Sequence, residues 1–102
     1  MEFCLSNENS SLTYKPDFLL PQLTNNGRKV LLEPHGIKSN LKDVLFKLSK
    51  FQEHYSEFFC LILIVPDDFV ETINNLDPDH NSYDFLWKQS DYKIKFENFH
   101  RS

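Results

Sequence analysis

The chain has 102 residues, of which 40% are hydrophobic, 15% aromatic and 25% charged. These proportions are typical of globular proteins and exclude a disordered chain, and the length leads us to expect a single domain. The sequence has two glycines and contains neither GxxxxGK[ST] nor GxGxxG, which argues against a P-loop or a dinucleotide site. Because the formal net charge is −4, any nucleic-acid binding would need a local basic patch or a metal ion.

The cysteines and the apolar runs bear on the location of the protein. Cys4 and Cys60 are far apart and outside any CxxC pair, so neither a zinc knuckle nor a disulfide framework is indicated. Residues 1–9 lack the cationic and apolar segments of a signal peptide, which predicts a cytoplasmic protein. The longest apolar run, residues 58–65, is too short to cross a bilayer, so we expect no membrane association.

The first third of the chain indicates a β-hairpin. Residues 1–10 form a polar lead with a marginal strand near Phe3 to Leu5. Residues 12–20 alternate apolar and polar side chains, which predicts a strand, and Pro16 places it at a sheet edge. The turn-rich segment 21–27 precedes a returning strand over 28–35.

A helical period follows from Asn40 to about Phe58, with Asn40 as the predicted N-cap. Residues 60–65, CLILIV, are a continuous apolar run of strand length, which is typical of a central strand covered on both faces. The helix between strands 28–35 and 60–65 has the length of a crossover, so we expect these strands to be parallel neighbours.

The last third of the chain is predicted to add small elements. Asp67 or Asp68 caps a short helix that continues to Leu76, and residues 77–82 form a loop. We expect one or two helical turns over 83–88 and a last strand over 92–96. The predicted fold class is therefore α/β, a small mixed β-sheet with a long crossover helix and short flanking helices.

The hairpin brings together the side chains that suggest chemistry. With a turn centred near Asn25, Asp17 pairs with Glu33 and Lys15 pairs with His35, all on one face. Two carboxylates in cross-strand contact repel each other unless a cation lies between them, and either Lys15 or a divalent metal fits that position. Mg²⁺ binds through one or two carboxylates, and His35 adds a ligand that favours Mn²⁺ or a base that activates water.

These residues resemble a known family. Lys-Pro-Asp at 15–17, a hairpin, a strand ending in Glu33-Pro34-His35, a crossover helix and an apolar strand look like the core of the PD-(D/E)xK nuclease superfamily over residues 12–66. The resemblance implies a restriction-endonuclease-like core within one nuclease-like domain, residues 1–102, in which Asp17, Glu33 and the Pro34 carbonyl bind catalytic Mg²⁺ or Mn²⁺. The family's lysine is replaced by His35, so Lys15 or Lys38 would supply the ammonium group in a minimal or divergent member.

The function that the resemblance implies is metal-dependent hydrolysis of DNA phosphodiesters, by an endonuclease of the repair or resolvase type. A chain of this size would work as a homodimer or as a subunit of a larger complex, since one copy offers little surface to a duplex. Lys38, Lys42 and Lys47, near the start of the long helix, are the candidates for DNA phosphate contacts.

Structural explanations remain open for the same residues. Lys15, Asp17 and Glu33 would also make an ion-pair cluster on a solvated sheet face, and the lysines would also be a solvated helix face. The main alternative function is a non-catalytic, nuclease-like interaction module that binds protein or nucleic acid, and a third is an accessory factor whose paired acids hold a structural ion.

Overall fold

The computed structural model describes residues 3–4, 13–14, 18–36 and 40–101. Within these residues, a four-stranded mixed sheet has the strand order β3-β4-β5-β6, and three α-helices pack around it. The strands are β3 (Phe18–Asn25), β4 (Arg28–Pro34), β5 (Phe59–Val65) and β6 (Phe85–Lys88), and the helices are α1 (Leu41–Tyr55), α2 (Val70–Leu76), which follows the short 3-10 helix η1 (Asp67–Phe69), and α3 (Tyr92–Arg101). The predicted α/β class with a mixed sheet is confirmed.

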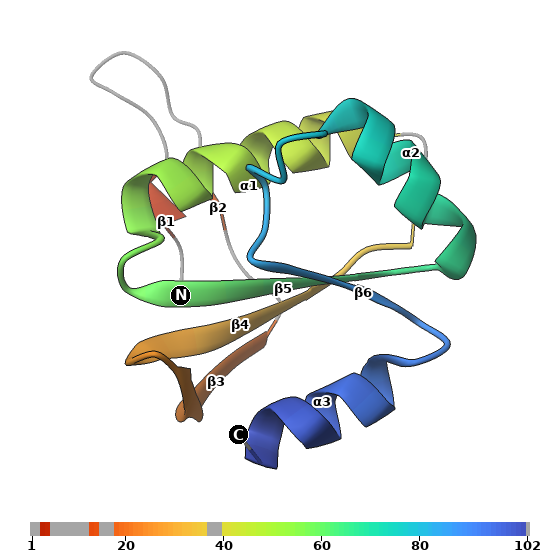
Figure 1. Cartoon of the computed structure of the whole chain (residues 1–102). Helices are drawn as coiled ribbons and strands as arrows, with labels where there is room; N and C mark the ends of the chain where they lie inside the picture. The colour runs from red at the N-terminus through yellow and green to blue at the C-terminus, as the bar shows by residue number, and fades with distance from the viewer. Residues whose placement is uncertain (1–2, 5–12, 15–17, 37–39, 102) are drawn as a thin grey trace.

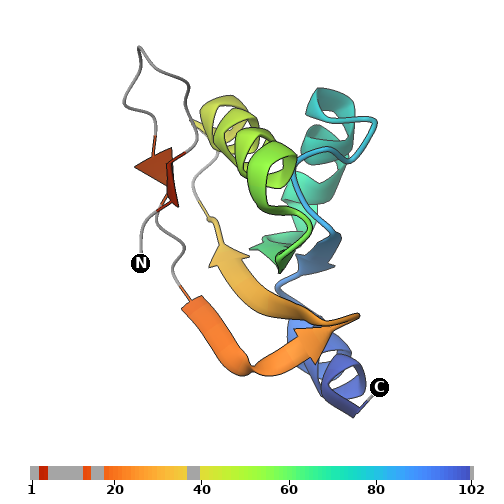
Figure 2. The same cartoon turned by 90° about the vertical axis from the view of Figure 1, so that its left-hand side faces the viewer.

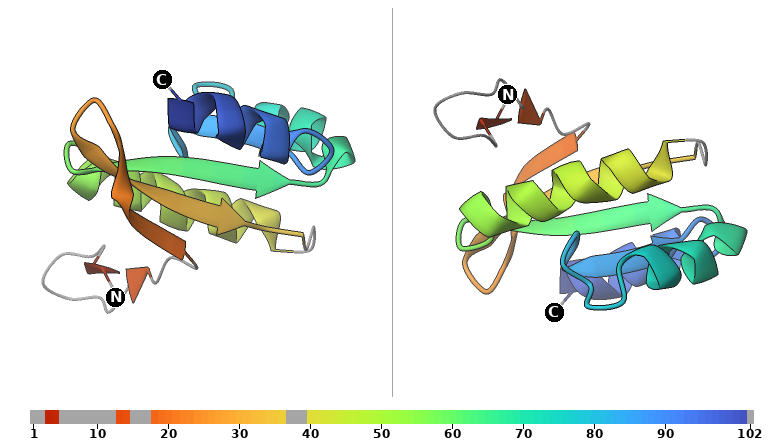
Figure 3. Two further views of the ribbon diagram at one scale, coloured as in Figure 1. Left: turned by 90° about the horizontal axis from the view of Figure 1, so that it is seen from below. Right: turned by 90° about the horizontal axis from the view of Figure 1, so that it is seen from above.

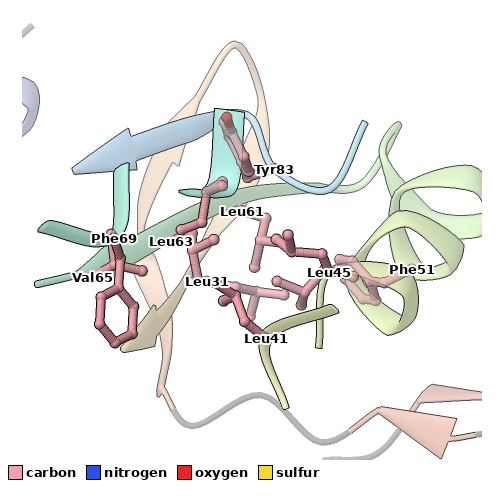
Figure 4. Close-up of a cluster of buried hydrophobic side chains, with 11 residues drawn as sticks. Leu31, Leu41, Leu45, Phe51, Leu61, Leu63, Val65, Phe69 and Tyr83 are labelled. Carbon is pink, nitrogen blue, oxygen red and sulfur yellow. The ribbon is translucent and has the colours of Figure 1, made fainter. Parts of the chain in front are cut away.

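The sheet is the middle of three layers. Helices α1 and α2 cover one face and α3 lies against the other (Figures 1 and 2). The larger buried cluster joins the first face to α1 and contains residues such as Leu31, Leu61 and Phe51 (Figure 4). On the opposite face, α3 packs beside β6, as the view from below shows (Figure 3, left). Both faces of β5 are therefore buried, as its continuous apolar sequence predicts.

The N-terminal hairpin pairs as expected near its open end, and its turn occupies only the last residues of the predicted turn segment. Phe18 pairs with Leu32 and Leu19 with Leu31, which is the predicted register. The turn lies within the predicted segment 21–27 but is shorter than expected, because β3 continues to Asn25 and the register shifts between Leu20 and Thr24. The tight turn is Asn26-Gly27, where both residues have positive φ, 54° and 83°, as a two-residue hairpin turn requires.

The segment predicted as one strand over 12–20 is also divided. Thr13–Tyr14 forms β2, which pairs with β1 (Phe3–Cys4) in a separate two-stranded sheet. The other described part, from Phe18 onward, belongs to β3 of the main sheet. The first strand of the prediction therefore contributes to two sheets rather than one.

The crossover is confirmed. Helix α1 begins after Asn40 and ends at Tyr55, three residues before the predicted end, and β4 and β5 are parallel neighbours. Asn40 occupies the N-cap position, but its side chain makes no capping hydrogen bond. The short helix expected after Asp67 is also present, as η1 followed by α2.

Two predictions near the C-terminus are wrong. Residues 85–88 form strand β6 parallel to β5 rather than a helical turn, because β5 would otherwise leave an unpaired edge. Residues 92–96 belong to helix α3 rather than to a last strand. Tyr92 and Phe96 pack against the sheet one helical turn apart, whereas Ile94 between them is 66% exposed, so the apolar alternation reflects helical spacing.

Candidate functional site

The side chains of strand β4 change from buried and apolar to partly buried and more polar toward its carboxyl end. Val30 and Leu31 are fully buried, whereas the strand ends in Glu33 and Pro34, followed by His35, all partly buried. This end lies at the carboxyl edge of the parallel strands, on the right of Figure 1, where β4 leads toward the start of α1. In open α/β sheets, ligands bind outside the carboxyl ends of the strands. The polar end of β4 therefore has the position of a binding site.

Glu33 and His35 lie on the sheet face that α1 covers. Side chains alternate along a strand, so Glu33 shares a face with Leu31, which packs in the cluster with α1. Its neighbour in β5 is Leu63, a buried member of the same cluster. The His35 N–H donates to the Ile64 carbonyl at 2.9 Å and extends the parallel ladder past Pro34. Glu33 and His35 consequently point to the same side, about 7 Å apart along the strand.

The side chain of His35 has an unusual environment. Its Nε2 atom is buried and has no hydrogen-bond partner in the described part of the chain. A buried nitrogen without a partner is destabilising relative to the solvated state, so such an atom usually has a ligand, an ion or a water. Nε2 is therefore a buried nitrogen without a partner in the described part of the chain, on the same side of β4 as Glu33.

Three of the predicted site residues lie outside the described residues: Lys15, Asp17 and Lys38. Glu33, Pro34 and His35 are described and lie consecutively at the end of β4. Among the described residues, no three His, Cys, Asp or Glu side chains gather closely enough to hold a metal ion. Of the predicted metal ligands, Glu33 and Pro34 are thus described, whereas Asp17 is not.

The described lysines of α1 do not form one surface. Lys42 is exposed in the first turn and lines a pocket of about 250 Å³ with Phe46 and Leu76. Lys47 is five residues further on, which turns its side chain by about 140° around the helix axis. Lys50 pairs with Glu53 at 3.4 Å and lies over the Phe46 ring. A joint phosphate grip by Lys42 and Lys47 therefore requires DNA to contact two sides of α1.

A polar network that the sequence did not predict lies nearer the amino ends of the strands. The Asp84 carboxylate accepts hydrogen bonds from Arg28 Nη1 at 3.0 Å, Gln52 Nε2 at 3.2 Å and the Leu61 N–H at 2.8 Å. The Asp84 N–H in turn donates to the Leu61 carbonyl. This side chain completes the backbone pairing of β5 just before β6 begins. No sequence signal identified it, because residues 83–88 were expected to be helical.

The loop over 77–82 serves a structural role, as expected of a turn-rich segment. The Asp77 carboxylate accepts from the N–H groups of Asn81 and Ser82, both at 3.0 Å. The Ser82 hydroxyl donates to the Leu45 carbonyl and attaches the loop to α1. Burial, with a smaller contribution from the Asp77 charge, raises the pKa of Tyr83, whose hydroxyl contacts His80 Nδ1 at 2.7 Å. In these contacts, the polar side chains of the loop bind nearby groups of the protein itself.

Comparisons of the chain with protein-family models, with curated proteins and with solved structures found no match. In the described part of the chain, no helix has both the length and the apolar character needed to cross a membrane.

Proposed function

We propose that this protein is a divalent-metal-dependent nuclease with a restriction-endonuclease-like core that hydrolyses phosphodiester bonds in DNA. The observation that carries the proposal is that Glu33 and His35 follow each other at the carboxyl end of β4, two residues apart and so on the same side of the strand. Carboxylates at partly buried strand ends, beside an imidazole, are residue types that metal-dependent hydrolases use.

The hairpin register supports a second carboxylate at the same place. Phe18 pairs with Leu32, and Leu19, opposite Leu31, packs against the cluster beneath α1. The sequence prediction that pairs Asp17 with Glu33 uses this same register, although Asp17 itself lies outside the described residues. Cross-strand side chains have Cβ atoms about 5 Å apart, which suits two ligands of one ion.

Each residue then has a defined role. Asp17, Glu33 and the Pro34 carbonyl would hold Mg²⁺ or Mn²⁺, oxygen donors being the ligands that hard cations prefer. When bound, the ion would stabilise the negative charge that develops on the phosphate. Water attacks the phosphorus atom, the bond to the leaving oxygen breaks, and that oxygen takes up a proton. Lys15 would place a positive charge beside the phosphate, in the role that the family gives to the lysine replaced here by His35.

The interaction-module alternative makes different predictions for the same site. A scaffold that lacks the family's lysine and binds DNA or protein without chemistry needs neither a metal nor Glu33. Its binding would survive chelation and the Glu33→Gln substitution. Cleavage that depends on both would instead support the nuclease.

The test is cleavage of supercoiled, single-stranded and branched DNA with Mg²⁺ or Mn²⁺. We expect wild-type protein to cleave at least one substrate, and Glu33→Gln and Asp17→Asn to lower the rate by about 100-fold or more, since each removes a metal ligand. Glu57→Gln is the matched control, because Glu57 is exposed in the turn that precedes β5. Wild-type protein that cleaves none of these substrates, or cleavage that Glu33→Gln leaves intact, would overturn the proposal.

A further inference from the structure

We infer that the pocket between residues 42–49 of α1 and residues 76–82, the α1–α2 pocket, is a docking site for a partner protein. The partner would insert a large apolar side chain that has an acidic residue next to it. The pocket has a volume of about 250 Å³ and lies where α1 faces the end of α2 and the loop that follows, on the sheet face that both helices cover (Figure 1). Neither Glu33 nor His35 lines it, so this docking site does not depend on the proposed nuclease activity.

Exposed apolar side chains form two walls of the α1–α2 pocket. Phe46 of α1 is 56% exposed, and Leu76, the last residue of α2, is 45% exposed. Apolar side chains exposed beside a concave surface are typical of interaction sites, because a bound partner removes them from water. A volume of about 250 Å³ is below the roughly 300–1,000 Å³ of pockets for drug-sized ligands, so it fits one large side chain of a partner.

The polar atoms of the pocket wall are mostly engaged within the protein. The Ser49 hydroxyl donates to the Phe46 carbonyl at 2.7 Å. The Asp77 carboxylate accepts from the N–H groups of Asn81 and Ser82, and the Ser82 hydroxyl donates to a backbone carbonyl of α1. Apolar contact is therefore the main interaction that this pocket offers to a ligand.

The accessible charge at the α1–α2 pocket is positive. Lys42 is exposed, and its ammonium group has no hydrogen-bond or ion-pair partner among the described residues. Asp77, which also lines the pocket, is only 8% exposed and already accepts two backbone N–H groups. Lys50 Nζ lies 5.6 Å from the centroid of the Phe46 ring. A carboxylate of the partner is therefore complementary to Lys42, whereas a basic partner would be repelled.

These features favour a protein partner over DNA at this surface. A phosphate group would pair with Lys42 but would leave Phe46 and Leu76 in water. An apolar side chain between Phe46 and Leu76 buries both, and an acidic neighbour pairs with Lys42 at the rim. The combination of apolar and acidic groups is thus the chemistry that matches the whole pocket.

The test is titration of the ¹⁵N-labelled chain with three capped dipeptides, followed by the amide chemical shifts of Ser49 and Asn81. The first probe is N-acetyl-phenylalanyl-glutamate amide, and in the two matched probes lysine replaces the glutamate or alanine replaces the phenylalanine. We expect the first probe to bind with a dissociation constant in the millimolar range, about two- to fivefold below that of the lysine probe. The alanine probe should cause no saturable shifts, because it lacks the side chain that fills the pocket.

Variants of the pocket test each part of its chemistry. Phe46→Ser and Leu76→Ser should weaken binding of the phenylalanyl-glutamate probe by about fivefold or more. Ile94→Ser is the matched control, because Ile94 is 66% exposed on α3, across the sheet from the pocket (Figure 2). Lys42→Glu should reverse the charge preference, so that the lysine probe binds more tightly than the glutamate probe.

Four outcomes would overturn the docking site. The first two are a charge preference that Lys42→Glu does not reverse, and binding that Phe46→Ser weakens no more than Ile94→Ser does. If the amides of Ser49 and Asn81 shift when the protein alone is diluted, a second copy occupies the pocket and the proposed partner is wrong. A short DNA duplex that shifts the same amides and displaces the dipeptide would show that this surface contacts DNA instead.

Discussion

Asp84 offers the sharpest test of the forces that hold the sheet together. Its carboxylate accepts hydrogen bonds from Arg28, Gln52 and the backbone N–H of Leu61, a residue with no exposed surface. Replacing Asp84 by alanine leaves that buried N–H without an acceptor, which costs about 1–3 kcal/mol. Loss of the ion pair with Arg28, whose side chain is 21% exposed, adds up to about 1 kcal/mol. We expect Asp84→Ala to lower the free energy of unfolding by about 1–4 kcal/mol.

Asp84→Asn separates the two contributions. Asparagine retains a side-chain oxygen that can accept from the Leu61 N–H, but it removes the charge that faces Arg28. We therefore expect Asp84→Asn to cost about 1 kcal/mol, clearly less than the alanine variant.

The measurement is urea unfolding followed by the fluorescence of Trp87, the one tryptophan of the sequence, which is buried beneath α3. Asp68→Ala is the control, because Asp68 is exposed in η1, and it should change stability by less than about 0.5 kcal/mol. If Asp84→Ala costs no more than Asp68→Ala, the carboxylate does not complete the β5 backbone pairing and the reasoning is refuted.

Two further predictions concern a core thiol and the helix lysines. Burial, reinforced by the Asp84 charge, raises the pKa of Cys60 from 9.0 to about 11. The unfolded chain thus loses this proton first, so the thiol contribution to stability is complete below pH 9 and declines toward pH 11. Urea titrations should show this decline, and Cys60→Ala should make it smaller. If α1 contacts DNA near the site, Lys42→Gln should weaken DNA binding and lower its salt dependence by about one counterion. Lys50→Gln is the control and should do neither, because Lys50 is paired with Glu53. Equal fluorescence anisotropy titrations for the two variants would rule out the contact.

The elements that sequence reasoning predicted well are those whose local pattern agrees with their burial. The run CLILIV is buried on both faces, and the apolar stripe of α1 supplies Leu41, Leu45, Leu48 and Phe51 to the core. The C-terminal segments failed because their patterns are short. Tyr92, Ile94 and Phe96 satisfy a period of two, yet only the two aromatic residues pack, at the spacing of a helical turn. Strand β6 forms because β5 needs a neighbour, and this requirement is not visible in residues 85–88 themselves.

The register and the turn of the hairpin are determined by different interactions, and the site prediction depends on the register. The turn, Asn26-Gly27, lies slightly beyond the centre expected near Asn25, but the pairing of Leu19 with Leu31 is the expected one, because both leucines must face the core beneath α1. A slip of one residue would move Leu19 to the other face, so burial fixes the register at this end of the hairpin. The register at the turn is set by Asn26-Gly27, and the irregularity between Leu20 and Thr24 accommodates the difference between the two registers. The proposed meeting of Asp17 with Glu33 therefore depends on the packing of Leu19 and Leu31, not on the turn, and a substitution in the turn should leave metal binding intact.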